Sequence, residues 1–223
     1  MAKRNSGWES ILESPQCREV VARVGALRKK GRSVYPNEKD VFRAFEDCPF
    51  KKVRVVILGQ DPYPSKGQAI GRAFAVPKST KVLPRSLKNI FDEVRLDYPG
   101  QLMPKSTLES WAKQGVFLLN TTLTVEGGRS NSHNAKLGWK KAVTIPTLKK
   151  LSDEREHLVF MLWGRHAKSF ENILDRQRHL ILKASHPSPL SVLKGFRKCG
   201  HFSKANDYLG EHSIDPIIWT DGS

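Results

Sequence analysis

The sequence predicts an α/β protein in which a parallel sheet is covered by helices on both faces. Four short apolar runs are rich in β-branched and aromatic residues and are bounded by glycine or polar residues, as strands are. Their near-continuous apolarity is typical of strands buried on both faces. Patterns with helical spacing lie between these runs, and such alternation favours a parallel sheet. The 223 residues suit one compact domain, which we expect to span residues 1–223.

The predicted elements can be read along the chain. Before the first strand, apolar residues recur at helical spacing in three groups, Trp8–Leu12, Val20–Leu27 and Val41–Phe45. The four predicted strands are Val53–Leu58, Val116–Val125, Leu158–Trp163 and Leu180–Ala184.

Further helices are predicted between these strands. Apolar spacing predicts a helix over Ser86–Leu96, and another over Ala167–Leu174. The S-x-x-E pattern at 106–109 has the form of a capping box and predicts that a short helix begins there. Gly138–Leu151 also has helical spacing, and Pro146 should set the start of that helix or kink it.

The charge balance points to a polyanionic partner. Lys and Arg number 38 against 22 Asp and Glu, so the formal net charge is +16. Nucleic acid is the commonest large polyanion that such a surface attracts. The alternative is a basic surface that is merely well solvated. Hydrophobic residues make up 39%, which supplies a core and excludes wholesale disorder.

Several classes of protein are excluded by composition. The three cysteines are far apart and supply neither a disulfide framework nor the ligands of an iron–sulfur cluster. No apolar run approaches the ~18 residues of a membrane helix. The first ten residues carry no apolar stretch behind their basic residues, so we expect no secretory signal. We therefore expect a reduced, intracellular protein that is not associated with a membrane.

Polar residues follow the predicted strands, where ligands bind in open parallel sheets. Asp61 lies in GQDPYP at 59–64, directly after the first apolar run, and Asn120 lies within the second run. His186 lies in HPSPLS at 186–191, just after the fourth run. Each has a structural alternative: a turn at Asp61, a tie between loops at Asn120, and a strand-end cap at His186. Metal hydrolysis lacks an HExxH pattern, and serine chemistry lacks a GxSxG elbow.

Six segments together identify a family. They are GQDPYP at 59–64, GRAFAV at 71–76, WAKQGVFLLNTTLTV at 111–125, NSH at 131–133, LVFMLWG at 158–164 and HPSPLS at 186–191. In this order they closely resemble the family 1 uracil-DNA glycosylases, from Val34 to Trp219. The resemblance implies one domain with a central four-stranded, twisted parallel sheet flanked by helices. It also implies hydrolysis of the N-glycosidic bond of deoxyuridine in DNA, which releases uracil and leaves an abasic site, without metal or cofactor.

The resemblance implies a role for each matching residue. Asp61 would orient or activate the water that attacks C1′, and a neutral His186 would donate a hydrogen bond to uracil O2. The apolar side chain of Leu190 would wedge into the base stack, although a core anchor is the alternative. Phosphates would be gripped by Ser86, Ser188 and Ser191.

Four residues would bind the uracil ring. Asn120 would pair with N3–H and O4, and Phe74 would stack on the base, with core packing as its alternative. Tyr63 would block the C5-methyl group of thymine. Gln60 would contribute through its backbone at the edge of the pocket.

The sequence departs from the family pattern at four positions. Pro64 replaces a histidine, Arg85 a proline, Lys198 a glycine, and Arg72 an apolar residue beside the stacking phenylalanine. Pro64 removes one phosphate contact and Arg85 offers another. Lys198 changes how its loop approaches the DNA backbone.

The expected partners are single- and double-stranded DNA containing uracil, and a proteinaceous glycosylase inhibitor. We expect a monomer in the cytoplasm, or in the nucleus for a protein of a eukaryote or its virus. Two other classes stay open, a non-catalytic DNA-binding subunit and a glycosylase with a wider pocket. Retention of Asp61, Asn120 and His186 argues against the first, and Tyr63 argues against the second.

Overall fold

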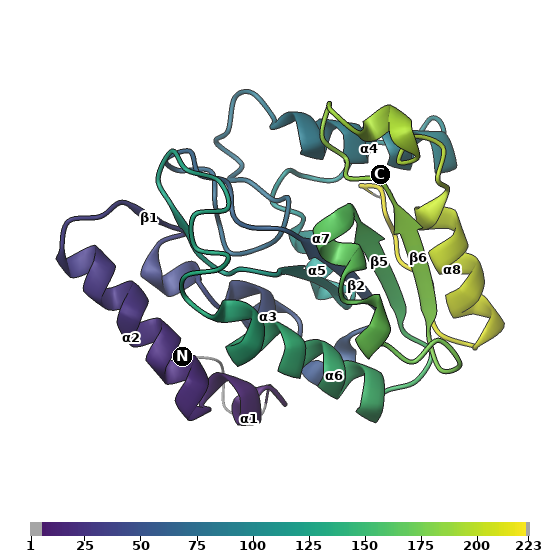
Figure 1. Cartoon of the computed structure of the whole chain (residues 1–223). Coiled ribbons are helices and arrows are strands. Elements are labelled where there is room, and N and C mark those ends of the chain that lie inside the picture. Colours follow the sequence, from purple (N-terminus) through teal and green to yellow (C-terminus); the bar gives the residue numbers. More distant parts are fainter. Residues whose placement is uncertain (1–5, 222–223) are drawn as a thin grey trace.

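A four-stranded parallel sheet forms the centre of the computed structural model, which describes residues 6–221 (Figure 1). Its strands are β2 (Val55–Gly59), β3 (Val116–Asn120), β5 (Val159–Trp163) and β6 (Leu180–Ala184), in the order β3-β2-β5-β6. All three pairings are parallel, which confirms the predicted fold class. Residues 1–5, where the segment considered for a secretory signal begins, lie outside the described residues.

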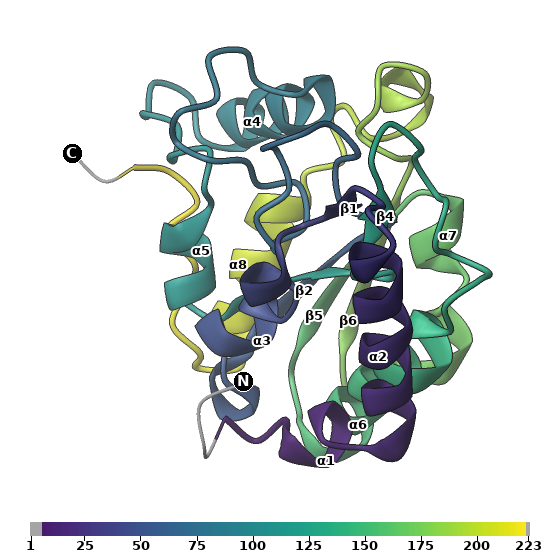
Figure 2. The ribbon, with the colours of Figure 1, turned by 90° about the vertical axis from the view of Figure 1, so that its left-hand side faces the viewer.

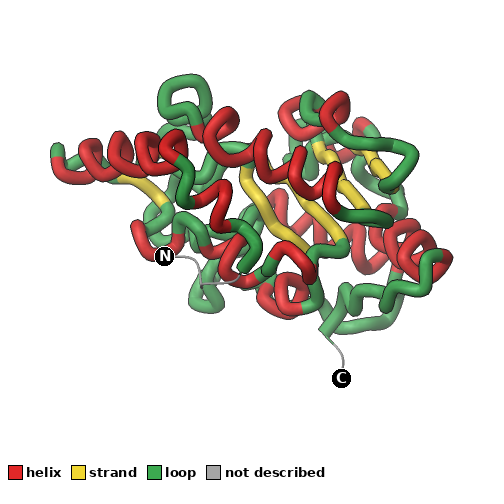
Figure 3. Tube along the Cα trace, turned by 90° about the horizontal axis from the view of Figure 1, so that it is seen from below, coloured by secondary structure: helices red, strands yellow, loops and turns green. Residues whose placement is uncertain are grey.

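Helices cover both faces of this sheet. They are α1 (Glu9–Leu12), α2 (Pro15–Lys29), α3 (Arg43–Asp47), α4 (Arg85–Asp97), α5 (Glu109–Lys113), α6 (Ile145–Glu154), α7 (Arg165–Lys168) and α8 (His201–Glu211). A short antiparallel pair joins β1 (Val34–Tyr35) to β4 (Val125–Glu126). Figure 2 shows α5 and α8 on one side of the strands and α2 and α6 on the other, with α4 above the strands. Figure 3 shows the strands between these layers of helices from below.

The strands divide their side chains between two hydrophobic cores, because successive residues of a strand point to opposite faces. In β2, Val56 and Leu58 pack with α1, α2 and α6. Their neighbours Val55 and Ile57 pack with α4, α5 and α8. This two-sided burial explains why the strand sequences are apolar throughout.

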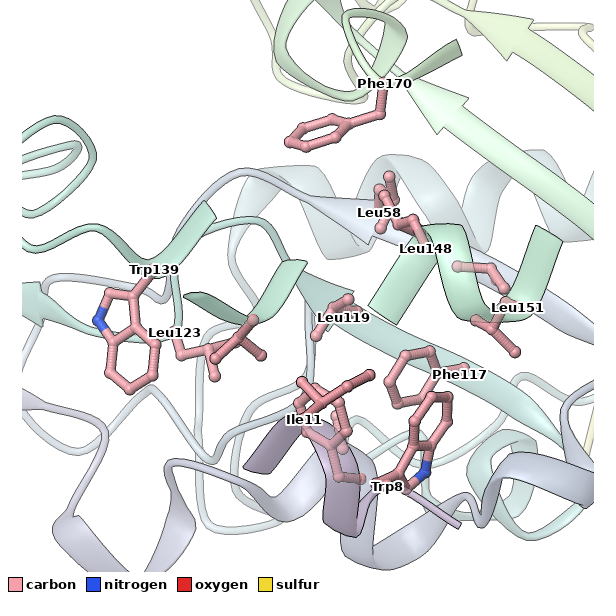
Figure 4. Close-up of a cluster of buried hydrophobic side chains, with 14 of the residues drawn as sticks. Trp8, Ile11, Leu58, Phe117, Leu119, Leu123, Trp139, Leu148, Leu151 and Phe170 are labelled. Atoms are coloured by element: carbon pink, nitrogen blue, oxygen red, sulfur yellow. The ribbon is translucent and has the colours of Figure 1, made fainter. Parts of the chain in front are cut away.

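Aromatic rings fill much of the first core (Figure 4). Trp8 stacks on Phe117 of β3 with ring centroids 5.1 Å apart. The indole N–H of Trp8 donates a hydrogen bond of 3.0 Å to the backbone oxygen of Cys48, so its polar atom is satisfied within the core. The chain before the first strand therefore belongs to the same folded body as the sheet.

All four predicted strands are confirmed, with ends shifted by one or two residues at the first and third and a shorter second strand. β3 ends at Asn120 instead of Val125, and Val125 belongs to the separate strand β4. The helix predicted at Ser86–Leu96 is α4. Pro146 lies in the first turn of α6, and a π-helical turn over Lys140–Thr144 leads into that helix.

Two local predictions are wrong. The capping box at 106–109 does not form, because the Ser106 hydroxyl donates to the backbone oxygen of Pro77, and Leu108 precedes α5 in a left-handed conformation. The helix predicted over Ala167–Leu174 is divided into α7 and a 3₁₀ turn at Glu171–Ile173. Phe170, between the two turns, is buried in the first core. The apolar residues of this segment are therefore buried although it does not form one continuous helix.

The sheet places the ends of its strands side by side. Gly59 of β2 pairs with Asn120 of β3, and Trp163 of β5 pairs with Ala184 of β6. Because the strands are parallel, the segments that leave these four residues begin at the same edge. Within residues 6–221, no helix is long and apolar enough to cross a membrane.

Candidate active site

A cavity of about 180 Å³ opens at this edge of the sheet. It is lined by Gln60, Asp61, Pro62, Tyr63, Pro64, Ala69, Gly71, Arg72, Phe74, Ser86, Asn120, Ser130 and His186. Every residue predicted to act on uracil is therefore in one place, together with Ser86. The other predicted DNA contacts follow on the loop behind His186: Ser188, Leu190 and Ser191.

Asn120 reaches the cavity from the last position of β3. A Cβ atom on Gly59 of the neighbouring strand would lie 2.3 Å from its Oδ1, so only glycine allows this close approach. The side chain of Asn120 is buried, and among residues 6–221 no hydrogen bond to its amide is found. An amide that is buried yet lines a cavity is available to a ligand. The predicted alternative, a tie between two loops, does not describe this side chain.

The backbone at Gln60 is held by the loop that follows β3. Its carbonyl oxygen accepts hydrogen bonds from the Thr121 hydroxyl, at 2.8 Å, and from the Thr122 N–H, at 3.1 Å. These two bonds join the loops that follow β2 and β3. The edge of the cavity therefore has a fixed backbone.

Asp61 lies directly after that backbone. Its carboxylate accepts hydrogen bonds from the Asn131 backbone N–H and, at 3.2 Å, from the Ser130 hydroxyl. Burial raises the pKa of Asp61, whereas these two donors and the nearby His166 oppose that rise. The carboxylate is thus oriented and only partly hydrated, as a group that handles a water molecule must be.

His186 follows β6 and has a defined proton arrangement. Its Nδ1 accepts a hydrogen bond of 3.0 Å from the backbone N–H of Ser188. A backbone N–H can only donate, so the proton of the neutral ring is on Nε2. Burial lowers the pKa of His186, and His166 lowers it further, so both favour the neutral ring that this hydrogen bond requires. The site therefore contains an uncharged N–H donor.

Phe74 and Tyr63 form the aromatic wall. The Tyr63 hydroxyl donates to the backbone oxygen of Phe74 at 3.1 Å, and burial raises the pKa of this phenol, which keeps it protonated. Phe74 has a left-handed backbone, with φ of 64°. Its ring lies 5.6 Å from that of Trp163 and 5.9 Å from that of His186. Phe74 therefore packs in the second core and lines the cavity, so both of its expected roles are compatible.

The loop behind His186 is held by its serines. The hydroxyl groups of Ser188 and Ser191 are 3.0 Å apart, and that of Ser191 donates to the backbone oxygen of His186 at 2.8 Å. Leu190, between them, is 86% exposed. The alternative that Leu190 anchors the core is therefore wrong.

Sequence reasoning missed two groups at this site. Ser130 and the backbone of Asn131 hold Asp61, although the NSH motif at 131–133 marked this segment.

The structure also explains why an arginine can replace the family's apolar residue at position 72. Its guanidinium is buried, donates to Asp47 at 2.6 Å and to the Thr107 backbone oxygen at 3.0 Å, and so replaces an apolar contact by an ion pair.

The groups that line the cavity differ in chemistry. Among residues 6–221, no cluster of three or more histidine, cysteine, aspartate or glutamate side chains could hold a metal ion. The cavity combines an oriented carboxylate, a neutral imidazole N–H, an amide and an aromatic ring. Fold and site are thus those of an α/β protein with a polar cavity, walled on one side by an aromatic ring, at the carboxyl edge of its parallel sheet.

Comparisons with known proteins identify the family. The family profile described as Uracil DNA glycosylase superfamily matches residues 45–210. The uracil-DNA glycosylase of Neisseria gonorrhoeae is 48% identical over 217 residues, which cover 95% of this chain and 98% of that protein. That of Actinobacillus succinogenes is 45% identical over 217 residues, covering 95% and 96%. The chain belongs to the uracil-DNA glycosylase superfamily.

Solved structures agree with this assignment. The mimivirus uracil-DNA glycosylase superposes with a TM-score of 0.89 at 28% identity, over 98% of this chain and 87% of that one. A mimivirus UNG variant in complex with UGI superposes with a TM-score of 0.87 at 28% identity, over 95% and 85%. The predicted family and fold are therefore confirmed.

Proposed function

We propose that the chain hydrolyses the N-glycosidic bond of deoxyuridine in DNA, with Asp61 and His186 as its catalytic residues. The enzyme class, a uracil-DNA glycosylase of base excision repair, follows from family membership. The residue roles rest on one observation: Asp61, Asn120, Phe74 and His186 line the same small cavity.

The proposed reaction uses the two catalytic groups at opposite ends of the breaking bond. Asp61 holds a water molecule, whose oxygen forms a bond to C1′ as the bond from C1′ to uracil N1 breaks. The electron pair of that bond leaves with uracil, which becomes an anion, and the proton lost by the water goes to solvent through the carboxylate. The Nε2–H of His186 donates to O2 as charge develops there. In a cavity with little water, such a pre-aimed donor stabilises the transition state by several kcal/mol, about 2.7–4 in comparable sites.

Selection of uracil is assigned to the walls of the cavity. Asn120 has an acceptor for N3–H and a donor for O4, and Phe74 stacks on the ring. The ring of Tyr63, held by its hydrogen bond to Phe74, would collide with a methyl group on C5. The backbone of Gln60 closes the edge of the pocket.

Binding of DNA is assigned to the rim. Ser86, Ser188 and Ser191 would hold phosphates, and the exposed Leu190 would fill the space that a flipped base leaves. Flipping costs a few kcal/mol, which these contacts offset. The net charge of +16 supports attraction to the backbone of both single- and double-stranded DNA.

Several wider properties belong to the same proposal. We infer one catalytic domain over residues 1–223, because both cores share the central sheet. We also propose that it acts as a monomer. A cytoplasmic location is supported by the bacterial sources of the curated relatives. A proteinaceous inhibitor is a further expected partner, since a UNG variant of the same fold was solved in complex with UGI.

One assay tests the proposal directly. The chain is incubated in EDTA with an oligonucleotide that carries one uracil, and abasic sites are then cleaved with alkali. We expect a strand break at the uracil and none in a thymine control. A chain that binds this DNA without producing a break would be a non-catalytic binding protein, and cleavage at thymine would indicate a wider pocket.

A further inference from the structure

A row of polar side chains on α4 faces the C-terminal part of the chain. Asn89, Glu93 and Asp97 follow one another at intervals of four residues, so they lie on one side of the helix. Ser86, in the first turn of the same helix, lines the cavity. One rigid element therefore extends from the candidate phosphate site to the end of this row.

Glu93 is the buried member of the row, with 1% of its surface exposed. Its Oε2 accepts a hydrogen bond of 2.7 Å from the backbone N–H of Lys198, and its Oε1 accepts one of 3.1 Å from that of Gly200. No ion pair of Glu93 is found among residues 6–221, so these two amides compensate for the burial of its charge. Lys198 and Gly200 both have left-handed φ angles of 63°, which form the turn that meets the carboxylate.

Asn89 holds the other end of the same loop. Its side-chain N–H donates a hydrogen bond of 2.7 Å to the backbone oxygen of Pro187. The segment 187–200, which we call the Leu190 loop, is therefore attached to α4 at both ends. Between these attachments, Leu190 and Leu193 are 86% and 81% exposed, and Phe196 is buried in the second core.

The two attachments relate the Leu190 loop to Ser86. Phe196 is buried in the second core, and Val192 and Cys199 pack against that core, so apolar contacts keep the loop on the protein. Such contacts are non-directional and do not by themselves set the position of the loop along α4. The two hydrogen bonds from the Lys198 and Gly200 N–H groups to the Glu93 carboxylate are directional and fix the position of the loop along α4. Duplex DNA requires a defined separation between Ser86 and Leu190, because Ser86 would contact a phosphate while Leu190 enters the base stack.

We propose that Glu93 is a positioning residue, which fixes the Leu190 loop relative to Ser86 so that the wedge and the phosphate contacts engage duplex DNA together. The inference rests on the proposed function. Glu93 does not touch the reacting atoms, and its two contacts lie at the far end of the loop from Ser188, which holds His186. Its removal should therefore lower the duplex rate more than the single-strand rate. Single-stranded DNA, which has little stacking to replace, depends on this positioning less than a duplex does.

The test compares Glu93→Gln with Asp97→Asn. Asp97 makes the same kind of contact one turn further along α4, accepting from the N–H groups of Phe202 and Ser203 at 3.1 and 2.9 Å, but it holds α8 and not the Leu190 loop. The values of kcat/KM on a U·A duplex and on the single strand are measured with Tm. We expect Glu93→Gln to lower the duplex-to-single-strand ratio about tenfold. Asp97→Asn should lower Tm and change that ratio less than about twofold.

A double-mutant cycle with Leu190→Ala shows whether Glu93 acts through the wedge. In the Leu190→Ala background, Glu93→Gln should change the ratio less than about threefold. The inference is overturned if the full tenfold effect remains in that background. It is also overturned if Glu93→Gln lowers kcat/KM equally on the duplex and on the single strand. Should Glu93→Gln fail to fold, Asn89→Ala, which cuts the other attachment, must lower the ratio at least about threefold. A wild-type chain inactive on both substrates would refute the proposed function itself, whereas an active one with unchanged ratios in the variants refutes only this inference.

Discussion

The cavity and the Leu190 loop lie next to each other, but they differ in the burial and the chemistry of their side chains. In the cavity, Asp61 and His186 are partly buried. Burial raises the pKa of Asp61 and lowers that of His186, so it favours the neutral form of each side chain. On the loop, Leu190 is almost fully exposed, and its neighbouring serines face each other across 3.0 Å. In the cavity, where there is little water, the charge and the proton position of a side chain strongly affect the reaction. On the exposed loop, the area in contact with DNA and the position of the backbone matter more. The comparison implies that variants of the cavity change the reaction and variants of the loop change DNA engagement.

The largest effect is expected from the catalytic pair. Asp61→Asn and His186→Ala should each lower single-turnover rates on the order of 10²–10⁴-fold, because their interactions belong mainly to the transition state. Binding of uracil-containing DNA, measured by fluorescence anisotropy, should change little. Asp215→Asn, at a carboxylate that is 90% exposed, is the control and should keep full activity. Wild-type rates in both variants would show that the mechanism is misassigned.

The next effect concerns the choice of base. Cytosine has the opposite hydrogen-bond polarity to uracil at positions 3 and 4, so Asn120→Asp, with its carboxyl protonated, should gain some cytosine excision and lose uracil activity on the order of 10²-fold. Tyr63→Ala should admit thymine because the blocking ring is gone. Release of each free base is measured by chromatography. If folded variants release neither new base, the assignment of the pocket walls is wrong.

A smaller effect is expected at the rim. Leu190→Ala should slow excision from a U·A pair about tenfold, from a U·G mismatch less, and from single strands least, because the wedge offsets lost stacking. Tm should stay unchanged, since the side chain is exposed. Equal losses on all three substrates would remove Leu190 from the DNA contacts.

The smallest expected effect is the pH dependence of stability that the burial of Asp61 causes. Burial favours protonated Asp61, so its contribution to folding is favourable at low pH and is lost as pH rises through its raised pKa. Asp61→Asn removes that charge and should raise Tm by a few degrees at pH 7, with the gain shrinking toward pH 4. The acid limb of the wild-type rate should lie above the ordinary carboxyl pKa, because the ionised form is required. Thermal melts and pH–rate profiles measure both, and a Tm gain that does not depend on pH would contradict the assigned cause.

Much of the cavity could be predicted, because its residues follow directly from strands that are visible as apolar runs. Asp61, Asn120 and His186 each stand at or just beyond such a run, and parallel strands end at one edge. The contacts that support them could not be predicted in this way. Asn131 reaches Asp61 from 70 positions away, and Glu93 reaches Lys198 across 105. Neither pairing leaves a periodic pattern in the sequence.

Local patterns also failed where a distant segment competed for the same group. The S-x-x-E pattern at 106–109 predicts a capping box, but Ser106 forms its hydrogen bonds with the segment at Val76 and Pro77 instead. Its backbone oxygen accepts from the Val76 N–H at 3.0 Å and its hydroxyl donates to Pro77. The helix therefore begins at Glu109, after a left-handed Leu108.

The sequence by itself determined the α/β class, the strands and the identity of the residues at their ends, since hydrophobic periodicity and turn chemistry act over a few residues. Only the tertiary structure decided that Leu190 is exposed, that the amide of Asn120 faces a cavity, and that Glu93 is buried under the Leu190 loop. Exposure and pairing at these positions depend on which distant segments pack together. That choice is made by the whole core at once and not by any local run of residues.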